Sequence, residues 1–332
     1  MKSVKEFTEN LKKSPADCTG IDIGASVTKI VRLKAVGNKI TVIGADLVKP
    51  AANGNISIPM NLRARYASIA TSCNNAIIKL FSFTGPIESA FKKSLPQKLG
   101  INADDDFRLS YTTITEGSVR SESSVLVAAM PEEDAKRVML QFSSGVPAPY
   151  SLEITAIAIL TAFEHGPVRN SSKTTTGLID FGTNSTFLSI FHKRKLVMMR
   201  KFDFGTNLVM ERLQSTLRVN SDIARGMLDD VSFDISDMLG GLINSIASDL
   251  IISRDFIERD KNCKIDNLFA IGGIALSKTS IQSLEKAMSI EITPWDPFDN
   301  LNLPPALEAD IEDQHWRFAG AIGAALATLE EK

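Results

Sequence analysis

Two short segments of the chain repeat the same acidic, glycine-bearing pattern about half the chain apart. Residues 20–33 read GIDIGASVTKIVRL, and residues 177–190 read GLIDFGTNSTFLSI. Aligned on their aspartates, the segments pair Asp22 with Asp180, Gly24 with Gly182, and Thr28 with Thr186, at the same offsets in both copies. Apolar residues flank both copies, so each predicts a strand, a tight turn and a second strand. One shared ligand, held from two sides, would explain the repetition.

The residue types in these turns suit a phosphate group beside a divalent cation. A glycine lacks a Cβ, so phosphate oxygens can approach the backbone N–H groups closely, and hydroxyl side chains add donors. A carboxylate would repel a phosphate unless Mg²⁺ and its water lay between them. We therefore predict Asp22 and Asp180 as catalytic residues that orient the metal. The predicted phosphate-binding residues are Gly24, Ala25, Ser26, Val27, Thr28, Lys29, Gly182, Thr183, Asn184, Ser185 and Thr186. A single turn of this kind could equally be an ordinary hairpin with a capping aspartate.

A third glycine-bearing segment follows the two turns. Residues 268–276 read LFAIGGIAL, which predicts a strand that ends in a glycine pair and enters a helix. Glycines at this position let a flat ring or a ribose lie against the backbone. A tight strand–helix connection is the alternative, but the order of the three segments favours a ligand site at Gly272, Gly273, Ile274 and Ala275.

The composition excludes several classes of protein. The chain has 332 residues, enough for two domains, and its 37 basic and 39 acidic residues leave no basic field of the kind that nucleic-acid binders use. The three cysteines lie far apart, which argues against a disulfide framework or a zinc site. The polar N-terminus lacks the apolar core of a signal peptide, and the apolar segments are too short to span a bilayer. We expect a cytoplasmic protein.

The elements that must position these residues can be partly predicted. Alternating residues around Gly37 predict a hairpin, and residues 63–74 predict a helix. Residues 77–146 predict a separate α+β block, with a helix broken at Pro96. Apolar residues that recur every four positions from Met238 predict one long amphipathic helix.

The ordered set of two phosphate turns and a later glycine motif resembles the actin/FtsA/Hsp70 ATPase superfamily. Within it, the chain resembles the PilM-like family of type IV pilus assembly over nearly all of residues 18–330. The segment that begins LIDFGTNSTFLSI is similar to the second phosphate turn of that family. The segment LFAIGGIALSKTS is similar to its adenosine motif, and FAGAIGAAL is similar to its closing helix.

The resemblance implies an α/β, actin-like ATPase fold of two RNase-H-like domains around a nucleotide cleft, with an inserted FtsA/PilM-type α+β subdomain. The implied units are an N-terminal extension at 1–17, a domain I at 18–76, 147–172 and 313–332, the inserted subdomain at 77–146, and a domain II at 173–312. ATP and Mg²⁺ are the implied cofactors. Further implied site residues are Gly205 and Glu211 for nucleotide binding and Glu153 for catalysis.

The family role implies a partner. The protein would bind the N-terminal tail of a PilN-like inner-membrane protein, in a groove that involves the inserted subdomain, and would serve the pilus assembly machinery. It would lie at the inner face of the inner membrane through that partner, with neither a membrane span nor a nucleic-acid partner of its own.

Departures from the family pattern leave alternatives open. Ile274 stands where a third glycine is usual, and we expect its bulk to lie near the nucleotide. Because no strong general base stands out, at most a slow Mg-dependent ATPase is expected, with binding favoured over turnover. A small-molecule kinase of the superfamily, an FtsA-like division protein and a scaffold without nucleotide are the alternatives. Residues 77–146 show no substrate-binding pattern of the kind that a kinase needs. The chain also lacks the basic amphipathic C-terminal helix expected of an FtsA-like protein.

Overall fold

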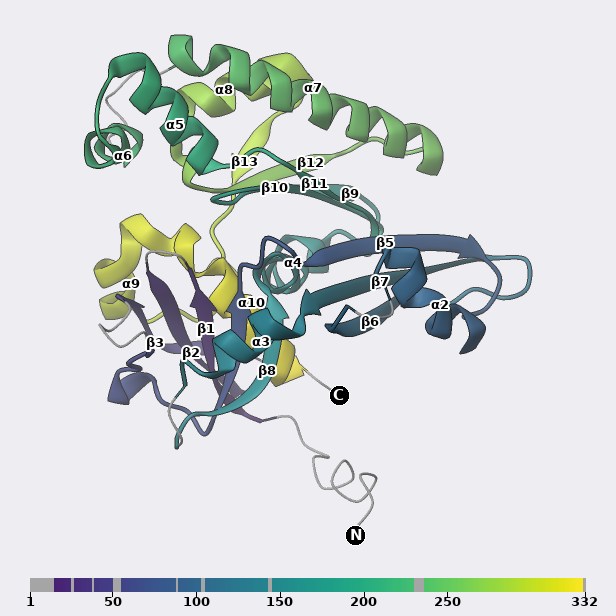
Figure 1. The fold of residues 1–332 in the computed structure, drawn as a ribbon, viewed down its shortest axis with the longest axis horizontal. Helices are drawn as coiled ribbons and strands as arrows, with labels where there is room; N and C mark the ends of the chain where they lie inside the picture. The colour runs from purple at the N-terminus through teal and green to yellow at the C-terminus, as the bar shows by residue number, and fades with distance from the viewer. Residues whose placement is uncertain are drawn as a thin grey trace.

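The structure of the chain is a computed structural model, shown in Figure 1. It describes residues 15–24, 27–37, 39–49, 55–87, 89–102, 105–142, 145–229 and 236–330. Three of the sequence predictions therefore lie outside the described residues: most of the N-terminal extension, and the two phosphate-turn residues Ala25 and Ser26.

The architecture is built on two five-stranded sheets of the same topology. The first sheet has the order β3-β2-β1-β4-β8 and the second has the order β11-β10-β9-β12-β13. In each, three consecutive strands pair antiparallel, a fourth strand adds in parallel to the first of them, and a fifth adds in parallel to the fourth. The strands of the first are β1 (Asp17–Ile23), β2 (Thr28–Val36), β3 (Lys39–Val48), β4 (Tyr66–Thr71) and β8 (Ala148–Ile154). Those of the second are β9 (Thr175–Phe181), β10 (Thr186–His192), β11 (Lys195–Phe202), β12 (Asn267–Gly272) and β13 (Ile292–Pro294).

The helices lie in two layers. Helices α4 (Thr155–His165) and α10 (Ala319–Glu330) pack against each other between the two sheets, where Phe163 of α4 contacts Phe191 and Phe269 of the second sheet. The outer face of the second sheet is covered by a layer of helices (Figure 1). They are α5 (Thr206–Leu217), α6 (Ser221–Asp229), α7 (Ser236–Lys261) and α8 (Lys278–Met288). The long amphipathic helix predicted from Met238 is α7.

A smaller α+β unit projects from the first half of the chain (Figure 1). Its sheet has the order β5-β7-β6, from β5 (Ile77–Thr84), β6 (Phe107–Thr115) and β7 (Glu122–Pro131). Helix α2 (Ser89–Leu99) covers one face, and α3 (Glu132–Met139) leads back toward β8. This unit matches the α+β block predicted for this part of the chain. The ion pair of Lys261 with Glu122, at 3.0 Å, ties it to the end of α7.

Four short helices connect these elements, and one segment crosses between the halves. The short helices are η1 (Met60–Leu62), η2 (Pro167–Asn170), η3 (Gly273–Leu276) and η4 (Glu312–Phe318), while α9 (Pro305–Ile311) precedes η4. Asn302 exchanges backbone hydrogen bonds with the free edge of β3, through the N–H of Val42 and the carbonyl of Ile40. The chain therefore returns to the first sheet before α10 begins.

Two local predictions are wrong. The helix predicted over residues 63–74 is instead the strand β4, which lies between β1 and β8 with both faces covered. A strand buried on both faces shows no alternation, and the small residues Ala67 and Ala70 suit a helix locally, so tertiary packing overrides propensity here. The predicted break at Pro96 does not occur, because α2 continues through it to Leu99.

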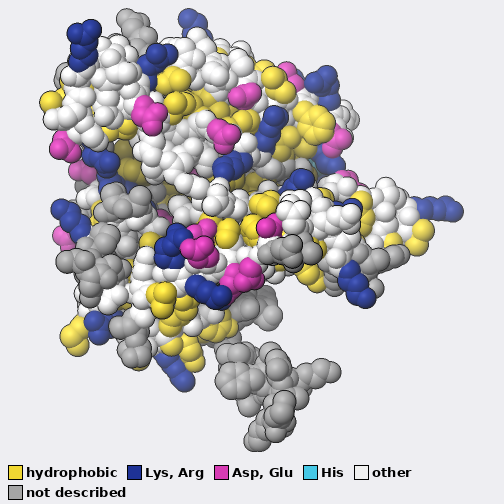
Figure 2. Space-filling view, viewed as in Figure 1, with side chains coloured by type: hydrophobic (Ala, Val, Ile, Leu, Met, Phe, Trp, Pro, Cys, Tyr) yellow, Lys and Arg dark blue, Asp and Glu magenta, His cyan; other side chains and the backbone are white. Residues whose placement is uncertain are grey.

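The distribution of charge on the surface agrees with the balanced numbers of acidic and basic residues in the chain. Basic and acidic side chains are interspersed on the face shown in Figure 2. Within the part of the chain that the structure describes, no helix combines the length and the apolar character needed to cross a bilayer.

Candidate functional site

The two aspartate turns occupy equivalent positions in the two sheets. In the first hairpin the last paired residues are Ile23 and Thr28, and in the second they are Phe181 and Thr186. The turns between them, residues 24–27 and 182–185, therefore connect equivalent strands of sheets with the same topology. The repeat in the sequence is a repeat of structure.

The Asp22 carboxylate is buried and held from two sides. Its exposed fraction is 4%. The Lys29 ammonium lies 3.0 Å from Oδ2, and the Thr155 hydroxyl donates a hydrogen bond of 2.8 Å to Oδ1. The same ammonium lies over the first turn, since a Cβ built on Gly24 would stand 2.7 Å from Lys29 Nζ. A cationic group therefore already occupies the space between the first turn and its aspartate.

Two helix N-termini converge on Asp22. Thr155 is the first residue of α4, and Gly320 is the second residue of α10. A Cβ built on Gly320 would lie 3.0 Å from the carboxylate carbon of Asp22. The positive ends of both helix dipoles thus point to one place, which favours negative charge from a carboxylate or a phosphate there.

Asp180 has no such compensation. Burial between the two halves raises the pKa of its carboxyl to about 7, and the nearby Asp22 carboxylate adds to the rise, while Lys29 opposes it. The side chain keeps a small exposed surface but is surrounded by protein on most sides. Two carboxylates near enough to interact, with one lysine paired to Asp22, leave a net negative charge that a divalent cation would offset.

The residues present fit Mg²⁺ carried by a nucleotide better than a free ion. Carboxylate oxygens are suitable ligands for Mg²⁺, which is usually bound by one or two carboxylates together with phosphates and water. Among the described residues, no group of three His, Cys, Asp or Glu side chains could hold a metal ion alone. Phosphate oxygens and water would therefore have to complete the shell around Asp22 and Asp180.

The start of α5 fixes the shape of the second turn. The N–H of Gly182 donates to the carbonyl of Ser185 at 3.1 Å. The N–H groups of Thr206 and Asn207 donate to the carbonyls of Gly182 and Thr183 at 3.0 and 2.9 Å, and Gly205 is the N-cap of the helix. The hydroxyl of Thr186 is fully buried and donates to the carbonyl of Phe204 at 2.8 Å. In this structure the Thr186 hydroxyl therefore stabilises the turn by bonding to the backbone just before α5.

Three asparagines connect the second turn to the first half of the chain. The amide of Asn184 donates to Oδ1 of Asn74, in the loop after β4, at 3.1 Å. The amide of Asn207 donates to Oδ1 of Asn184 at 2.7 Å. Lys201 Nζ also lies 3.5 Å from the Asn74 carbonyl oxygen. The turn is thus linked across the two halves by side-chain amides.

The glycine pair after β12 has two different roles. Gly272 has φ +101°, and a Cβ there would lie 2.1 Å from the carbonyl oxygen of Phe181, so glycine is required. Gly273 is not crowded, because a Cβ there would meet only the Thr206 hydroxyl and the Trp316 indole, both at 3.8 Å.

The expectation that Ile274 would place bulk beside the nucleotide is wrong. Its side chain is 3% exposed and packs, with Ala275, into the hydrophobic core of the second half. The chain turns into η3 directly after Gly272, and both side chains of this short helix are buried. Only their backbone could contact a ligand.

Two predicted residues lie away from Asp22. Glu153 lies on β8, two strands from β1, with Ala70 of β4 between it and Asp22 in the sheet register, and Ser151 donates to it at 3.4 Å. Glu211 is exposed on α5, one helical turn after Asn207.

The sequence reasoning missed Thr155, Asn74 and Trp316 as members of the site. Thr155 could have been found as the first residue after the strand that ends at Ile154. The other two carry no local signal, because both reach the site through tertiary packing.

Comparison with known proteins identifies the fold. No protein-family model matches the sequence, and no curated protein matches it either. A chain of the PilM–PilN type IV pilus biogenesis complex is similar in structure, with a TM-score of 0.76 and 18% identity over 95% of this chain and 99% of that one. The chain has the actin-like ATPase fold. The fold class that the family resemblance implied is confirmed, and at this identity the likeness concerns the fold alone.

Two further solved structures are similar at a lower level. One is the ethanolamine utilization protein EutJ from Carboxydothermus hydrogenoformans, with a TM-score of 0.48 and 12% identity over 94% of this chain and 90% of that one. The other is a Bacteroides thetaiotaomicron protein with an actin-like ATPase fold and unknown function, with a TM-score of 0.48 and 9% identity over 90% and 96%. TM-scores below 0.5 add nothing to the conclusion on the fold.

Proposed function

We propose that the chain is a nucleotide-binding assembly protein that takes up ATP with Mg²⁺ between its two sheets and binds the tail of a PilN-like inner-membrane protein. The observation that carries the first part is the convergence of two structurally equivalent aspartate turns. They come from separate sheets, yet Asn184 of the second turn bonds to Asn74 in the first half of the chain, and the Asp22 carboxylate adds to the raised pKa of Asp180. One ligand held by both turns accounts for this arrangement.

The chain's own residues divide the work of binding. Bound Mg²⁺ would supply the positive charge that neutralises the phosphates. Asp22 and Asp180 would hold the ion and its water, and Lys29, from its position beside Gly24, would neutralise phosphate charge. The backbone N–H groups of the second turn and the N-termini of α4 and α10 would favour the remaining negative charge. Glu153 lies two strands from Asp22 in the same row of the sheet, and we propose that turnover is slow because no described residue of the site stands out as a strong general base.

Calorimetric titration with Mg-ATP tests the nucleotide part of the proposal. We expect Asp22→Ala and Asp180→Ala each to weaken binding at least about tenfold, because each removes a group that orients the ion. Asp222→Ala, on the exposed face of α6, is the matched control and should bind as the wild type does. Unchanged affinity in both cleft variants would refute the assignment.

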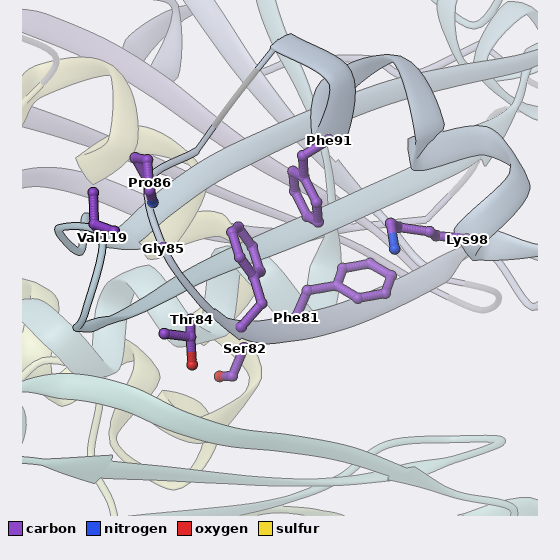
Figure 3. A pocket seen from close by; sticks show the side chains of 9 residues that line it. Phe81, Ser82, Thr84, Gly85, Pro86, Phe91, Lys98 and Val119 are labelled. Carbon is purple, nitrogen blue, oxygen red and sulfur yellow. The ribbon is translucent and has the colours of Figure 1, made fainter.

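The partner part of the proposal rests on the fold and on one pocket. The similar chain belongs to a complex described as PilM–PilN. In the present structure a pocket of about 550 Å³ opens on the inserted unit, between β5 and α2 (Figure 3). Such a volume suits a few side chains of a peptide. We propose that an extended tail of the partner docks here, next to β5, which is an edge strand of its sheet.

The lining of the pocket defines the chemistry of the tail. Phe81, Phe83 and Phe91 form its aromatic wall, with ring centroids 4.5 Å apart for Phe83 and Phe91. Lys98 lies on its rim with Nζ 5.7 Å from the Phe91 centroid, and Val119 is 80% exposed at its mouth. A tail with an apolar side chain next to a carboxylate would match both the aromatic wall and the lysine.

A pull-down with N-terminal tails of inner-membrane proteins, with and without Mg-ATP, tests the partner. Lys98→Glu should abolish capture of the tail, whereas Lys93→Glu, on α2 but outside the lining, should not change it. Capture that survives Lys98→Glu would refute this docking site. If the tail binds at this pocket, the partner would hold the protein at the cytoplasmic face of the inner membrane.

A further inference from the structure

Trp316 lies at the point where the glycine motif faces the last helix of the chain. It belongs to η4, which directly precedes α10. Its indole would be 3.8 Å from a Cβ built on Gly273. Four residues later, Gly320 lies against Asp22. The short segment from Trp316 to Gly320 therefore connects the glycine motif with the aspartate of the first turn.

The surroundings of Gly273 would admit a methyl group beside the Trp316 ring. Its backbone is not in the left-handed region, and a Cβ would meet only ordinary van der Waals contacts. Neither backbone conformation nor internal packing therefore requires a glycine at this position. Its neighbours are the Trp316 ring and the hydroxyl of Thr206. A small residue beside an aromatic ring leaves an apolar surface next to one polar group.

The indole itself is held but not fully covered. The guanidinium carbon of Arg317 lies 4.9 Å from the centroid of the Trp316 ring, so a cation–π contact fixes the ring from one side. The side chain packs at the edge of the core between the sheets and stays half-buried. Part of the ring surface is therefore open to a planar ligand.

The charges of the site divide it into two chemically different ends. Lys29, Asp22 and Asp180 gather at the end where the two turns meet. At the other end, Gly273 and Trp316 present an apolar, flat surface with the Thr206 hydroxyl as a neighbour. A ligand with phosphates at one end and a heteroaromatic ring at the other matches this division.

We propose that Trp316 is a base-positioning residue, against which the purine of the bound nucleotide packs. This inference rests on the proposed function, because it assumes that the two turns hold the phosphates of the same ligand. Base–aromatic contacts stabilise bound nucleotides enough to change affinity several-fold or more. Trp316 would therefore account for the tighter binding of a purine nucleotide than of its phosphate chain alone.

The chain allows a direct optical test, because it contains only two tryptophans, Trp295 and Trp316. Trp295 is buried in the core between the sheets. In the Trp295→Phe variant, Mg-ATP should change the emission of Trp316, whereas saturating Mg-tripolyphosphate should leave it unchanged. The Trp316→Phe variant, whose fluorescence comes from Trp295 alone, gives the matched background. An equal response to both ligands would overturn the proposal, because it would report phosphate binding without the base.

Affinities measured by calorimetry give the second readout. We expect Trp316→Leu, which keeps apolar bulk without a ring, to bind Mg-ATP roughly tenfold more weakly, and Trp316→Phe to bind within about threefold of the wild type. Binding of Mg-tripolyphosphate should be the same in all three proteins, which also shows that the variants are folded. Unchanged affinity of Trp316→Leu for Mg-ATP would overturn the inference. If the wild type bound neither ligand, the proposed function itself would fail.

Discussion

Asp22 and Asp180 occupy the same place in two equivalent hairpins but have opposite electrostatic surroundings. The residue paired with Asp22 across the first hairpin is Lys29, and the residue paired with Asp180 across the second is Phe187. One aspartate therefore has an ion-pair partner at 3.0 Å, while the other has an apolar neighbour and a raised pKa. The difference between Lys29 and Phe187 at this paired position leaves the second aspartate without a cationic partner.

The raised pKa of Asp180 predicts that stability without nucleotide depends on pH. The ordinary pKa of an aspartate is about 3.9, and the folded value is about 7. The neutral form is thus favoured in the folded state, so this stabilisation is complete below about pH 4 and is lost as the pH rises to 7. Thermal melts of the nucleotide-free protein should fall across this range by more than those of Asp180→Asn.

A second acid provides the control for this pH dependence. The pKa of Glu164 is raised in the same direction, but its side chain is exposed, so solvent screening leaves it a smaller effect on stability of the same sign. Glu164→Gln should therefore flatten part of the remaining dependence, and the double variant should flatten more than either alone. Parallel curves for the wild type and Asp180→Asn would contradict the prediction for Asp180.

Thr155 is expected to act on the nucleotide through Asp22. Its hydroxyl donates to the carboxylate at 2.8 Å, and a hydrogen bond to a charged group contributes about 1.5–3 kcal/mol. Thr155→Val should weaken Mg-ATP binding about tenfold or more and leave binding without Mg²⁺ little changed. Thr155→Ser, which keeps the hydroxyl, should restore most of the affinity in the same titration. Equal losses in both variants would indicate packing rather than orientation.

The element that positions the first half of the site is the small-residue helix α10. A Cβ built on Gly323 would lie 1.7 Å from the carbonyl oxygen of Ala158 in α4, so the two helices approach each other at backbone distance. This close packing places the start of α10 beside Asp22 and the start of α4 beside the same carboxylate. Glycines and alanines in α10 are thus a condition for two helix N-termini to meet at one point.

A pair of glycine substitutions tests this packing. Gly323→Ala should destabilise the fold by about 2 kcal/mol or more in urea denaturation, because the methyl group cannot be placed without moving α4. Gly241→Ala, in α7, meets nothing within 4 Å and should stabilise the protein by about 0.5–1 kcal/mol through helix propensity. Equal effects of the two substitutions would contradict the inferred contact between α4 and α10.

On the scale of the whole molecule, few polar contacts near the site join the halves. The asparagine bridge from Asn207 through Asn184 to Asn74 links the second turn to the loop after β4. The pair Lys261–Glu122 links α7 to the inserted unit, and exposed ion pairs of this kind contribute about 0–1 kcal/mol. Opening of the cleft to admit a ligand would first have to break the asparagine bridge.

Removal of the bridge should increase local opening at the second turn. One exposed hydrogen bond contributes about 0.5–1.5 kcal/mol, so Asn74→Ala should raise amide exchange in residues 182–185 up to about tenfold. Asn102→Ala removes an asparagine that bonds within its own turn, to Asp105, and should leave exchange at 182–185 unchanged. Hydrogen–deuterium exchange measures both variants, and identical protection would show that the bridge does not restrain the turn.

The sequence by itself determined the parts of this protein that are encoded locally. The repeated spacing around Asp22 and Asp180 was sufficient to predict two equivalent strand–turn–strand units, because a tight turn and its flanking strands depend on a few adjacent residues. The long helix α7 could be predicted in the same way, from apolar residues that recur every four positions. Together with the later glycine motif, these patterns indicated the fold class.

Only the tertiary structure decided how distant residues share the site. The strand β4 was predicted as a helix, since its pattern depends on burial by β1 and β8 on both sides. The sequence analysis expected the bulk of Ile274 to lie near the nucleotide, whereas its side chain packs into the core. Thr155 contacts Asp22 across 133 positions, and Trp316 lies beside Gly273 across 43, and no local pattern marks contacts between residues so far apart in the chain.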